Sequence, residues 1–374
     1  MPDTIVLAAN RGYALKSSRT LLIQRLLKAG CRVVLATADD AESRELAAMG
    51  AILEPVHFAR SGLAPIHDLR ALLRMRSIYR RHRPRLVHHF HSKPIIAGTC
   101  AALLDRHNRP AIVNTITGLG HAFIAGGLQQ RVVETGFRFA LPRADTTIFQ
   151  NSDDLELFRN KGLVHSEQAR MILGSGIDLQ HHAVVDRSTR APGSETVLMI
   201  GRLLGQKGIR EFAEIATAVR RSMPGVSFLL AGEEDPTHPD AMPRDWISRQ
   251  HDIAYAGRVS DVRALMAKAD LLLFPSYREG VPRVVMEAAA SGLPTVAFDV
   301  PGVREAVEPG VTGILIPFGD VRRMAEDTQR LLVDGHARNV MGAQARTLAE
   351  RRFDVREVTA SYLQIYRTLG LNLP

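Results

Sequence analysis

Residues 276–294 read Ser276-Tyr-Arg-Glu279-Gly-Val-Pro-Arg-Val-Val-Met-Glu287-Ala-Ala-Ala-Ser-Gly-Leu-Pro294 and carry two carboxylates eight positions apart. We expect Glu279 to lie in a turn beside Gly280. Glu287 is expected inside an Ala-rich helix that Pro282 begins at its first turn. Eight helical steps span roughly 12 Å, so the two acids can hold opposite ends of one elongated polar ligand.

The start of this helix favours an anion in the middle of such a ligand, because backbone N–H groups and the helix dipole are directed there. A sugar nucleotide has this layout, with hydroxyls at both ends and a diphosphate between them. The competing interpretation is an amphipathic helix with a surface Glu at each end. For two acids considered alone, this second interpretation is the more common one.

The length and composition predict a soluble protein of two domains, since 374 residues exceed one ordinary core. Hydrophobic residues make up 45% and charged residues 23%, values typical of globular proteins. No apolar run reaches the roughly 18 residues that span a bilayer. Residues 1–10 read as a first strand and not as a signal peptide. Cys31 and Cys100 are too few for a disulfide framework, and no His/Cys cluster has zinc spacing.

The net charge of +9 is concentrated in the first half of the chain. Residues 1–190 hold 26 Lys+Arg against 16 Asp+Glu, whereas the rest holds 22 against 23. Much of the excess comes from a probable helix with Leu69, Leu72, Leu73 and Tyr79 on its apolar side. Three interpretations compete: a solvated face, a nucleic-acid patch and a surface that meets anionic lipid. Nucleic acid is disfavoured because no aromatic residues are interleaved with the charges. The basic residues are Arg70, Arg74, Arg76, Arg80, Arg81, Arg83 and Arg85.

Predicted strands and helices alternate along both halves, which favours parallel doubly wound sheets. In the first half we expect strands at 4–8, 32–36, 86–90, 111–115 and 146–150, a loop at 10–18, and helices at 19–28, 40–49, 95–104 and 127–140. In the second half we expect strands at 196–200, 227–232, 253–256, 271–275 and 295–298, and helices at 209–221, 262–267, 325–332 and 338–351.

The fold class is therefore α/β, with two Rossmann-like domains facing across a cleft. We expect an N-terminal domain at 1–185, a C-terminal domain at 186–354 after a polar linker, and a helix at 355–374 that returns to the first domain. Each domain opens with a strand and a Gly-bearing loop. Ligands of such sheets bind at the carboxyl ends of the strands, which makes the cleft the expected site.

The second domain begins with a strand followed by Gly201-Arg202-Leu-Leu-Gly-Gln-Lys207-Gly208. This segment places two cations at the carboxyl end of a strand. Arg offers a fixed fork of donors and Lys a mobile charge, a pair suited to a diphosphate. The spacing matches neither a P-loop nor a dinucleotide fingerprint.

Further segments follow in a fixed order. Residues 256–262 read Ala-Gly257-Arg258-Val-Ser-Asp-Val, and 269–276 read Ala-Asp-Leu-Leu-Leu-Phe-Pro-Ser. The opening stretch comes next, and residues 310–317 read Gly-Val-Thr-Gly-Ile-Leu-Ile-Pro. In this order, across residues 196–320, the chain resembles the retaining glycosyltransferases of family 4, whose two-domain fold is called GT-B.

The resemblance implies a role for each matching residue. Arg202 and Lys207 would hold the donor diphosphate, Glu279 the hydroxyls of the donor sugar, and Glu287 the ribose hydroxyls. The catalytic residues would then be Arg202, Lys207 and Glu279. The other donor-binding residues would be Gly201, Gly280, Val281, Glu287, Gly257 and Arg258.

The first half is similar to a narrower branch of the family, the bacterial transferases that extend polyprenyl-diphosphate-linked sugars in surface polysaccharide or glycan synthesis. Residues 86–98 and 114–123 carry this similarity. Many family members have a His near the donor sugar where this chain has Thr117, so His121 is either its substitute or a loop residue. His88 fits the branch pattern but also fits a core histidine. The residues expected on the acceptor side are Gly12, Lys16, His88, Thr117, Gly118 and His121.

The resemblance implies a hexosyl- or N-acetylhexosaminyltransferase that uses a nucleotide diphosphate sugar, with a UDP-sugar favoured, and keeps the anomeric configuration. The acceptor would be a lipid-linked glycan, so the protein would be cytoplasmic and peripheral on an anionic inner-membrane surface. No cofactor or metal is indicated, because no D-x-D lies at a strand end. Two alternatives remain: a GT-B sugar-nucleotide epimerase and a non-catalytic sugar-nucleotide or lipid-binding module.

Overall fold

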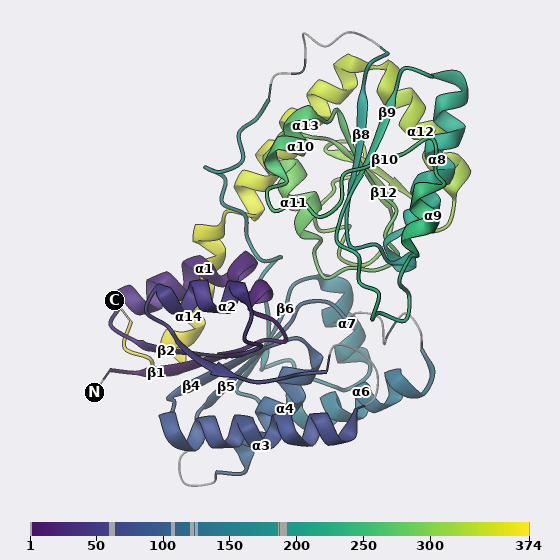
Figure 1. Ribbon diagram of the computed structural model, residues 1–374. Coiled ribbons are helices and arrows are strands. Elements are labelled where there is room, and N and C mark those ends of the chain that lie inside the picture. Colours follow the sequence, from purple (N-terminus) through teal and green to yellow (C-terminus); the bar gives the residue numbers. More distant parts are fainter. Residues whose placement is uncertain are drawn as a thin grey trace. The chain divides into compact units, whose positions relative to one another are not determined.

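The computed structural model describes residues 2–59, 64–105, 109–119, 123, 126–185, 187 and 193–373. The chain forms two compact units (Figure 1). Unit 1 comprises Met1–Gly176 and Val355–Pro374, and unit 2 comprises Ile177–Asp354. The first domain was expected to end at residue 185. Of the helices in the described residues, none has the length and apolar character needed to cross a bilayer.

Unit 1 is built on a parallel sheet in the order β3-β2-β1-β4-β5-β6-β7. Its strands are β1 (Thr4–Ala8), β2 (Arg32–Thr37), β3 (Ile52–Pro55), β4 (Leu86–Phe90), β5 (Ala111–Ile116), β6 (Thr146–Phe149) and β7 (Ala169–Met171). Its helices are α1 (Gly12–Lys28), α2 (Ala41–Ala48), α3 (Pro65–His82), α4 (Ser92–Leu103), α6 (Gly127–Ala140), α7 (Ser152–Asn160) and α14 (Val355–Thr368).

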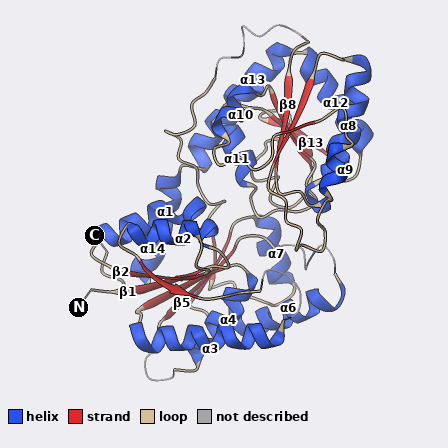
Figure 2. Ribbon diagram, in the orientation of Figure 1, coloured by secondary structure: helices blue, strands red, loops and turns tan. Residues whose placement is uncertain are grey.

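Unit 2 is built on a second parallel sheet, in the order β10-β9-β8-β11-β12-β13. Its strands are β8 (Thr196–Ile200), β9 (Ser227–Ala231), β10 (Ala254–Tyr255), β11 (Leu271–Phe274), β12 (Thr295–Phe298) and β13 (Gly313–Ile316). Its helices are α8 (Ile209–Ser222), α9 (Arg244–Ser248), α10 (Arg263–Lys268), α11 (Arg283–Ala290), α12 (Val321–Val333) and α13 (Gly335–Arg352). Figure 2 shows both sheets in red between their helices, which confirms the predicted fold class.

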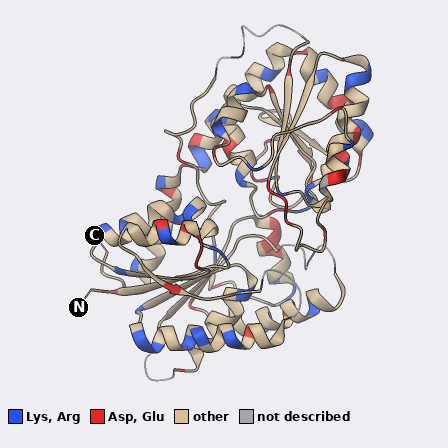
Figure 3. Ribbon diagram, viewed as in Figure 1, with Lys and Arg blue, Asp and Glu red and all other residues tan. Residues whose placement is uncertain are grey.

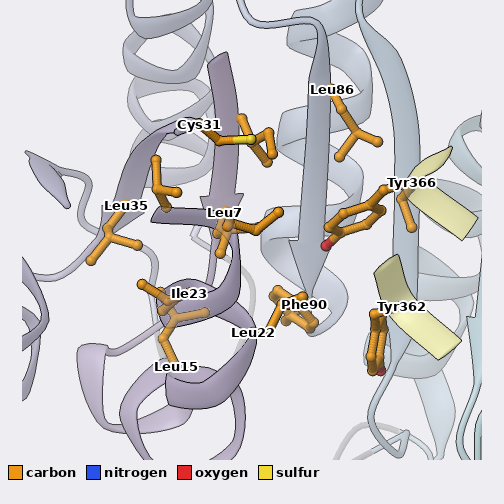
Figure 4. Close-up of a cluster of buried hydrophobic side chains, with 14 of the residues drawn as sticks. Leu7, Leu15, Leu22, Ile23, Cys31, Leu35, Leu86, Phe90, Tyr362 and Tyr366 are labelled. Carbon is orange, nitrogen blue, oxygen red and sulfur yellow. The ribbon is translucent and has the colours of Figure 1, made fainter. Parts of the chain in front are cut away.

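The core of unit 1 follows from the alternation of side chains along β1, because successive residues of a strand face opposite sides of the sheet. Ile5 and Leu7 pack with α1 and α14, whereas Val6 and Ala8 pack with α3. Figure 4 shows the first of these clusters, in which the rings of α14 lie beside β4. The C-terminal helix therefore returns to the first sheet, as the sequence predicts.

In each sheet the order of the strands reverses at the first strand, so that strands are added on both of its sides. β1 pairs with both β2 and β4, and β8 pairs with both β9 and β11. The loops that leave the two central strands therefore turn toward opposite faces, and α/β proteins commonly bind ligands at such positions. We call the position where the strand order reverses the switch point of each unit, and a ligand site is expected there.

Two local predictions about unit 1 were wrong. Residues 12–18 were expected in a loop but lie in α1, because the backbone N–H of Gly12 donates to the carboxylate of Asp40 at 2.8 Å and this stabilises the helix start. On α3, Leu69 and Leu73 were expected on the apolar side, yet they are 56% and 52% exposed. The buried side of α3 instead carries Ala71, Met75, Ile78, Tyr79 and His82.

Candidate active site

The loop after β8 is held in place by the backbone of β9 and by Asp240. The N–H of Gly201 donates to the Ala231 carbonyl at 3.0 Å. The carboxylate of Asp240 accepts from the backbone N–H of Gln206 at 2.6 Å, and its carbonyl accepts from Gly205 at 2.9 Å. The loop ends in a short 3-10 turn, Gly205–Lys207, that fixes the backbone of Lys207.

Two glycines allow neighbouring loops to touch this segment. A β-carbon on Gly232 would lie 1.7 Å from the carbonyl oxygen of Gly201. A β-carbon on Gly208, whose φ is +81°, would lie 2.0 Å from the carbonyl oxygen of Pro275. Because both obstacles are backbone atoms, no side chain fits at either position. The loops that leave β8, β9 and β11 therefore converge at the switch point of unit 2.

Lys207 and Glu279 meet at this point, although 72 positions separate them in the chain. The Lys207 ammonium forms an ion pair with the Glu279 carboxylate, which also accepts from the Ser276 hydroxyl at 2.6 Å. The side chains of Lys207 and Glu279 are only 20% and 13% exposed. A cation suited to phosphate and an acid suited to sugar hydroxyls thus lie side by side, and their predicted roles in donor binding stay predictions.

Arg202 lies in the same loop and is oriented by an acid from the loop after β9. Its guanidinium donates to the Asp235 carboxylate at 3.1 Å. The Arg202 side chain is 46% exposed, whereas Asp235 is buried. Asp235 therefore holds one side of the guanidinium and leaves donors of the fork directed toward solvent, as diphosphate binding requires.

Glu287 lies in the second turn of α11 and pairs with a basic residue one turn earlier. The Arg283 guanidinium donates to the Glu287 carboxylate at 2.8 Å. Burial raises the pKa of Glu287, and the field of Asp261 acts in the same direction, whereas Arg283 opposes both. Asp261 therefore lies near Glu287, and residues 257–261 follow β10 at the same edge of the sheet. Pro282 precedes α11 as its N-cap and does not occupy the predicted first turn.

The remaining predicted donor residues line the same edge. Gly280 is buried, and its carbonyl oxygen would lie 1.9 Å from a β-carbon on Gly302, so this backbone is tightly packed. Val281 is buried beside it. The carbonyl of Gly257, a residue at φ +69°, accepts from the N–H of Gly232 at 2.9 Å, and Arg258 follows directly.

The predicted acceptor residues are scattered through unit 1. Lys16 forms an ion pair with Glu45 on α2. His88 is fully buried, with Nδ1 bonded to the Tyr366 hydroxyl at 2.5 Å and Nε2 to Thr115 at 2.7 Å, and burial lowers its pKa well below the usual range. This is the environment of a core histidine. Thr117 and Gly118 directly follow β5 at the carboxyl edge, and His121 lies outside the described residues.

Sequence reasoning missed the acids that position the cations. Asp235 and Asp240 lie in the loop after β9, where the sequence reads Gly232-Glu-Glu-Asp235. This acidic run at the end of a predicted strand was the available signal. In the part of the chain that the structure describes, no group of three His, Cys, Asp or Glu side chains could hold a metal ion.

Two family models match the chain, one in each unit. A model described as "Glycosyl transferase 4-like domain" matches residues 18–173, and one described as "Glycosyl transferases group 1" matches residues 194–334. Together they span the described elements from α1 to α12.

Similar curated proteins act on sugars. One is the N,N'-diacetylbacillosaminyl-diphospho-undecaprenol alpha-1,3-N-acetylgalactosaminyltransferase of Campylobacter jejuni, 27% identical over 265 residues, which are 67% of this chain and 69% of that protein. Another is the capsular polysaccharide biosynthesis glycosyltransferase CapM of Staphylococcus aureus, 24% identical over 317 residues, 82% of each chain.

Solved structures share the fold. The sucrose-phosphate synthase of Thermosynechococcus elongatus superposes with a TM-score of 0.79 at 21% identity, covering 98% of this chain and 99% of that one. Anabaena HepE in complex with UDP and glucose superposes with a TM-score of 0.78 at 19% identity, covering 98% of this chain and 100% of that one. With the two family models and the convergence of Arg202, Lys207 and Glu279, the chain belongs to the family-4 glycosyltransferases and has their GT-B fold.

Proposed function

We propose that this glycosyltransferase moves a sugar from a UDP-sugar to a polyprenyl-diphosphate-linked glycan with retention of the anomeric configuration, in bacterial polysaccharide or glycoconjugate synthesis. The observation that carries the proposal is the pairing of Lys207 with Glu279 at the switch point of unit 2. The HepE complexes with UDP and with UDP-glucose support the donor, and the name of the Campylobacter relative supports the acceptor.

In the proposed reaction, the bond between the anomeric carbon and the diphosphate oxygen breaks, and the acceptor hydroxyl attacks from the same face. The departing phosphate oxygen takes the acceptor's proton. Negative charge grows on the diphosphate during this step, and Arg202 and Lys207 stabilise it as fixed cations. Glu279 holds the hydroxyls of the sugar, and the two basic residues perform the charge neutralisation that a metal supplies in other enzymes.

Glu287 is proposed to hold the ribose, so Glu287→Ala should raise the KM for the donor with little change in kcat. A hydrogen bond to a charged group contributes about 1.5–3 kcal/mol, which corresponds to roughly 10- to 150-fold in KM. The ribose does not change during the reaction, so its contacts bind ground state and transition state equally.

The control for this prediction is a 2′-deoxy donor. The wild-type protein should lose affinity for it, whereas Glu287→Ala should bind the deoxy and the ordinary donor with similar KM. A variant that still discriminates between the two donors by the wild-type factor would contradict the assignment of Glu287.

The proposed membrane surface is the exposed side of α3. Ile66, Leu69 and Leu73 are 66%, 56% and 52% exposed there, and Arg70 and Arg80 are exposed on the same helix. Figure 3 shows basic residues in blue along α3. Arg74 and Arg81 differ, because both pair with the buried carboxylate of Glu54. An apolar stripe bordered by exposed guanidinium groups matches an anionic lipid surface.

The double variant Arg70→Gln/Arg80→Gln should bind anionic vesicles about 30-fold more weakly, because each basic residue contributes about 1 kcal/mol near such a surface. Sedimentation with phosphatidylglycerol vesicles measures the loss, and raising the salt should weaken the wild type in the same way. The matched control is Arg322→Gln/Arg323→Gln, two exposed arginines of α12. Equal binding by both double variants would refute the α3 surface.

A direct test of the reaction combines UDP- and GDP-sugars with polyprenyl-diphosphate acceptors, with and without EDTA. NMR of the product should show an α-linkage from an α-donor, and EDTA should leave the rate unchanged. An inverted linkage would refute retention. Conversion of the donor to another sugar nucleotide without acceptor would establish the epimerase alternative.

A further inference from the structure

A groove on the surface of unit 1 has no part in the donor site. It runs between α1 and α14, which lie side by side on one hydrophobic cluster. The Arg19 guanidinium of α1 donates to the Tyr362 hydroxyl of α14 at 3.0 Å and ties the two helices together. The groove has a volume of about 420 Å³.

The floor of the groove is apolar. Ala29, Leu363 and Leu373 are partly buried there and pack against the cluster that Figure 4 shows. Ala360 lies one turn before Leu363 on the same side of α14 and is exposed. The core of unit 1 therefore reaches the surface at this point, and covering this floor with apolar side chains would be favourable.

Four basic side chains border the floor, Arg25 and Lys28 from α1 and Arg356 and Arg367 from α14. All four are exposed. Arg25 and Lys28 form no ion pair with any other residue that the structure describes. No acidic residue of the described chain lines the groove. The groove therefore combines an apolar floor with a positive charge on both sides.

The stability of the two helices accounts for only part of this charge. A cation near the end of a helix interacts favourably with the helix dipole, which is sufficient for Arg25, Lys28 and Arg367. Arg356 differs because it lies in the first turn of α14, where the dipole disfavours a positive charge. The dipole therefore does not explain all four cations, whereas a negatively charged partner does.

The spacing of the cations fits a helix better than a single lipid head group. Arg356 and Arg367 are eleven positions apart in α14, which is roughly 16 Å along the helix. A single head group carries its negative charge at one end of this length. An amphipathic helix in the groove would instead direct apolar side chains to the floor and acidic side chains to both rows of cations.

The side of the sheet on which the groove lies also disfavours lipid. α1 and α14 pack with Ile5 and Leu7, whereas α3 packs with Val6 and Ala8 on the other side of the sheet. The proposed membrane surface is on α3, so a membrane bound there would leave the groove uncovered. This step of the inference rests on the proposed function.

We propose that the groove between α1 and α14 binds an acidic amphipathic helix of a partner protein. The floor receives the apolar side of that helix, and its acids pair with Arg25 and Lys28 on one side and with Arg356 and Arg367 on the other. These ion pairs are exposed to solvent, so a higher salt concentration weakens the complex.

The probe is a fluorescein-labelled synthetic peptide of about 14 residues, with leucines at positions i, i+3, i+4 and i+7 and glutamates on both sides of them. It is titrated into the whole chain and binding is read by fluorescence anisotropy. We expect saturable binding to the wild type and a roughly tenfold weaker Kd for Arg25→Gln/Lys28→Gln, which removes two exposed ion pairs. A scrambled peptide of the same composition should bind at least tenfold more weakly, because its leucines no longer share one face.

The matched control is Arg131→Gln/Arg138→Gln, which removes the same charge from exposed positions of α6, a helix that does not line the groove. It should bind the peptide as the wild type does. Equal losses in the two double variants, or equal affinity for the scrambled peptide, would overturn the proposal.

A third variant tests the floor without changing the charge. Ala360→Gln keeps a residue that favours helix and places a longer side chain in the groove. Its thermal midpoint should stay unchanged while the peptide Kd rises roughly tenfold. Wild-type affinity in this variant would show that the peptide binds outside the groove and would overturn the proposal.

Anionic lipid is the competing occupant. Phosphatidylglycerol vesicles should bind Arg25→Gln/Lys28→Gln and the wild type alike. Weaker vesicle binding by this variant, together with no binding of the peptide, would assign the groove to a membrane and overturn the proposal. Because peptide binding is read directly, a failed sugar-transfer assay would leave this result intact, so the two proposals fail separately.

Discussion

Replacing Lys207 by alanine is expected to lower kcat by 100-fold or more with the donor saturating. The ammonium group lies where charge develops on the departing diphosphate, and removal of one preorganised donor of this kind costs roughly 100- to 1,000-fold. Arg202→Ala should also lower kcat. Initial rates of sugar transfer, measured at several donor concentrations, separate the effect on kcat from any effect on KM.

Lys207→Ala also leaves the Glu279 carboxylate without its partner, so a loss of stability must be distinguished from a loss of chemistry. Lys161 provides the control, because it forms a comparable ion pair with Glu134 on α6, with side chains 31% and 19% exposed. Lys161→Ala should lose similar stability and keep its turnover. Near-normal kcat in Lys207→Ala, or an equal fall in both variants, would refute the role of Lys207.

Much of the fold could be predicted from sequence because its main elements are strongly patterned. The strands at 4–8, 86–90, 196–200 and 295–298 have the bounds that the structure shows, since buried parallel strands read as short apolar runs. β3 and β7 were missed, because each is short and lacks such a run. The buried side of α3 was misassigned because leucines on both of its sides give an ambiguous pattern.

The residues of the candidate site could be predicted from the sequence, but the contacts between them could not. Lys207 and Glu279 were each identified from a local motif, but their pairing depends on β8 and β11 being neighbours in the sheet. Asp235 and Asp240 were missed for the same reason, since their partners lie in a loop more than thirty positions earlier.

The contact between Gly208 and Pro275 leads to the second large effect. Gly208→Ala should lower turnover by about 100-fold, since its β-carbon would lie 2.0 Å from the Pro275 carbonyl oxygen and must push the two loops apart. These loops carry Lys207 and Glu279, and a displacement of about 1 Å in catalytic groups can cost 100-fold. Kinetics with a UDP-sugar donor measure the loss.

Gly319→Ala separates this clash from the cost of the backbone conformation itself. Gly319 has φ +83°, close to the +81° of Gly208, but nothing lies within 4 Å of the position that its β-carbon would take. Alanine there should cost only the left-handed conformation, about 1–2 kcal/mol. We therefore expect Gly319→Ala to lower the thermal midpoint by several degrees and to keep its turnover. If instead Gly208→Ala resembles Gly319→Ala in both measurements, the convergence of the two loops does not position the catalytic pair, and the site assigned to this sheet edge is wrong.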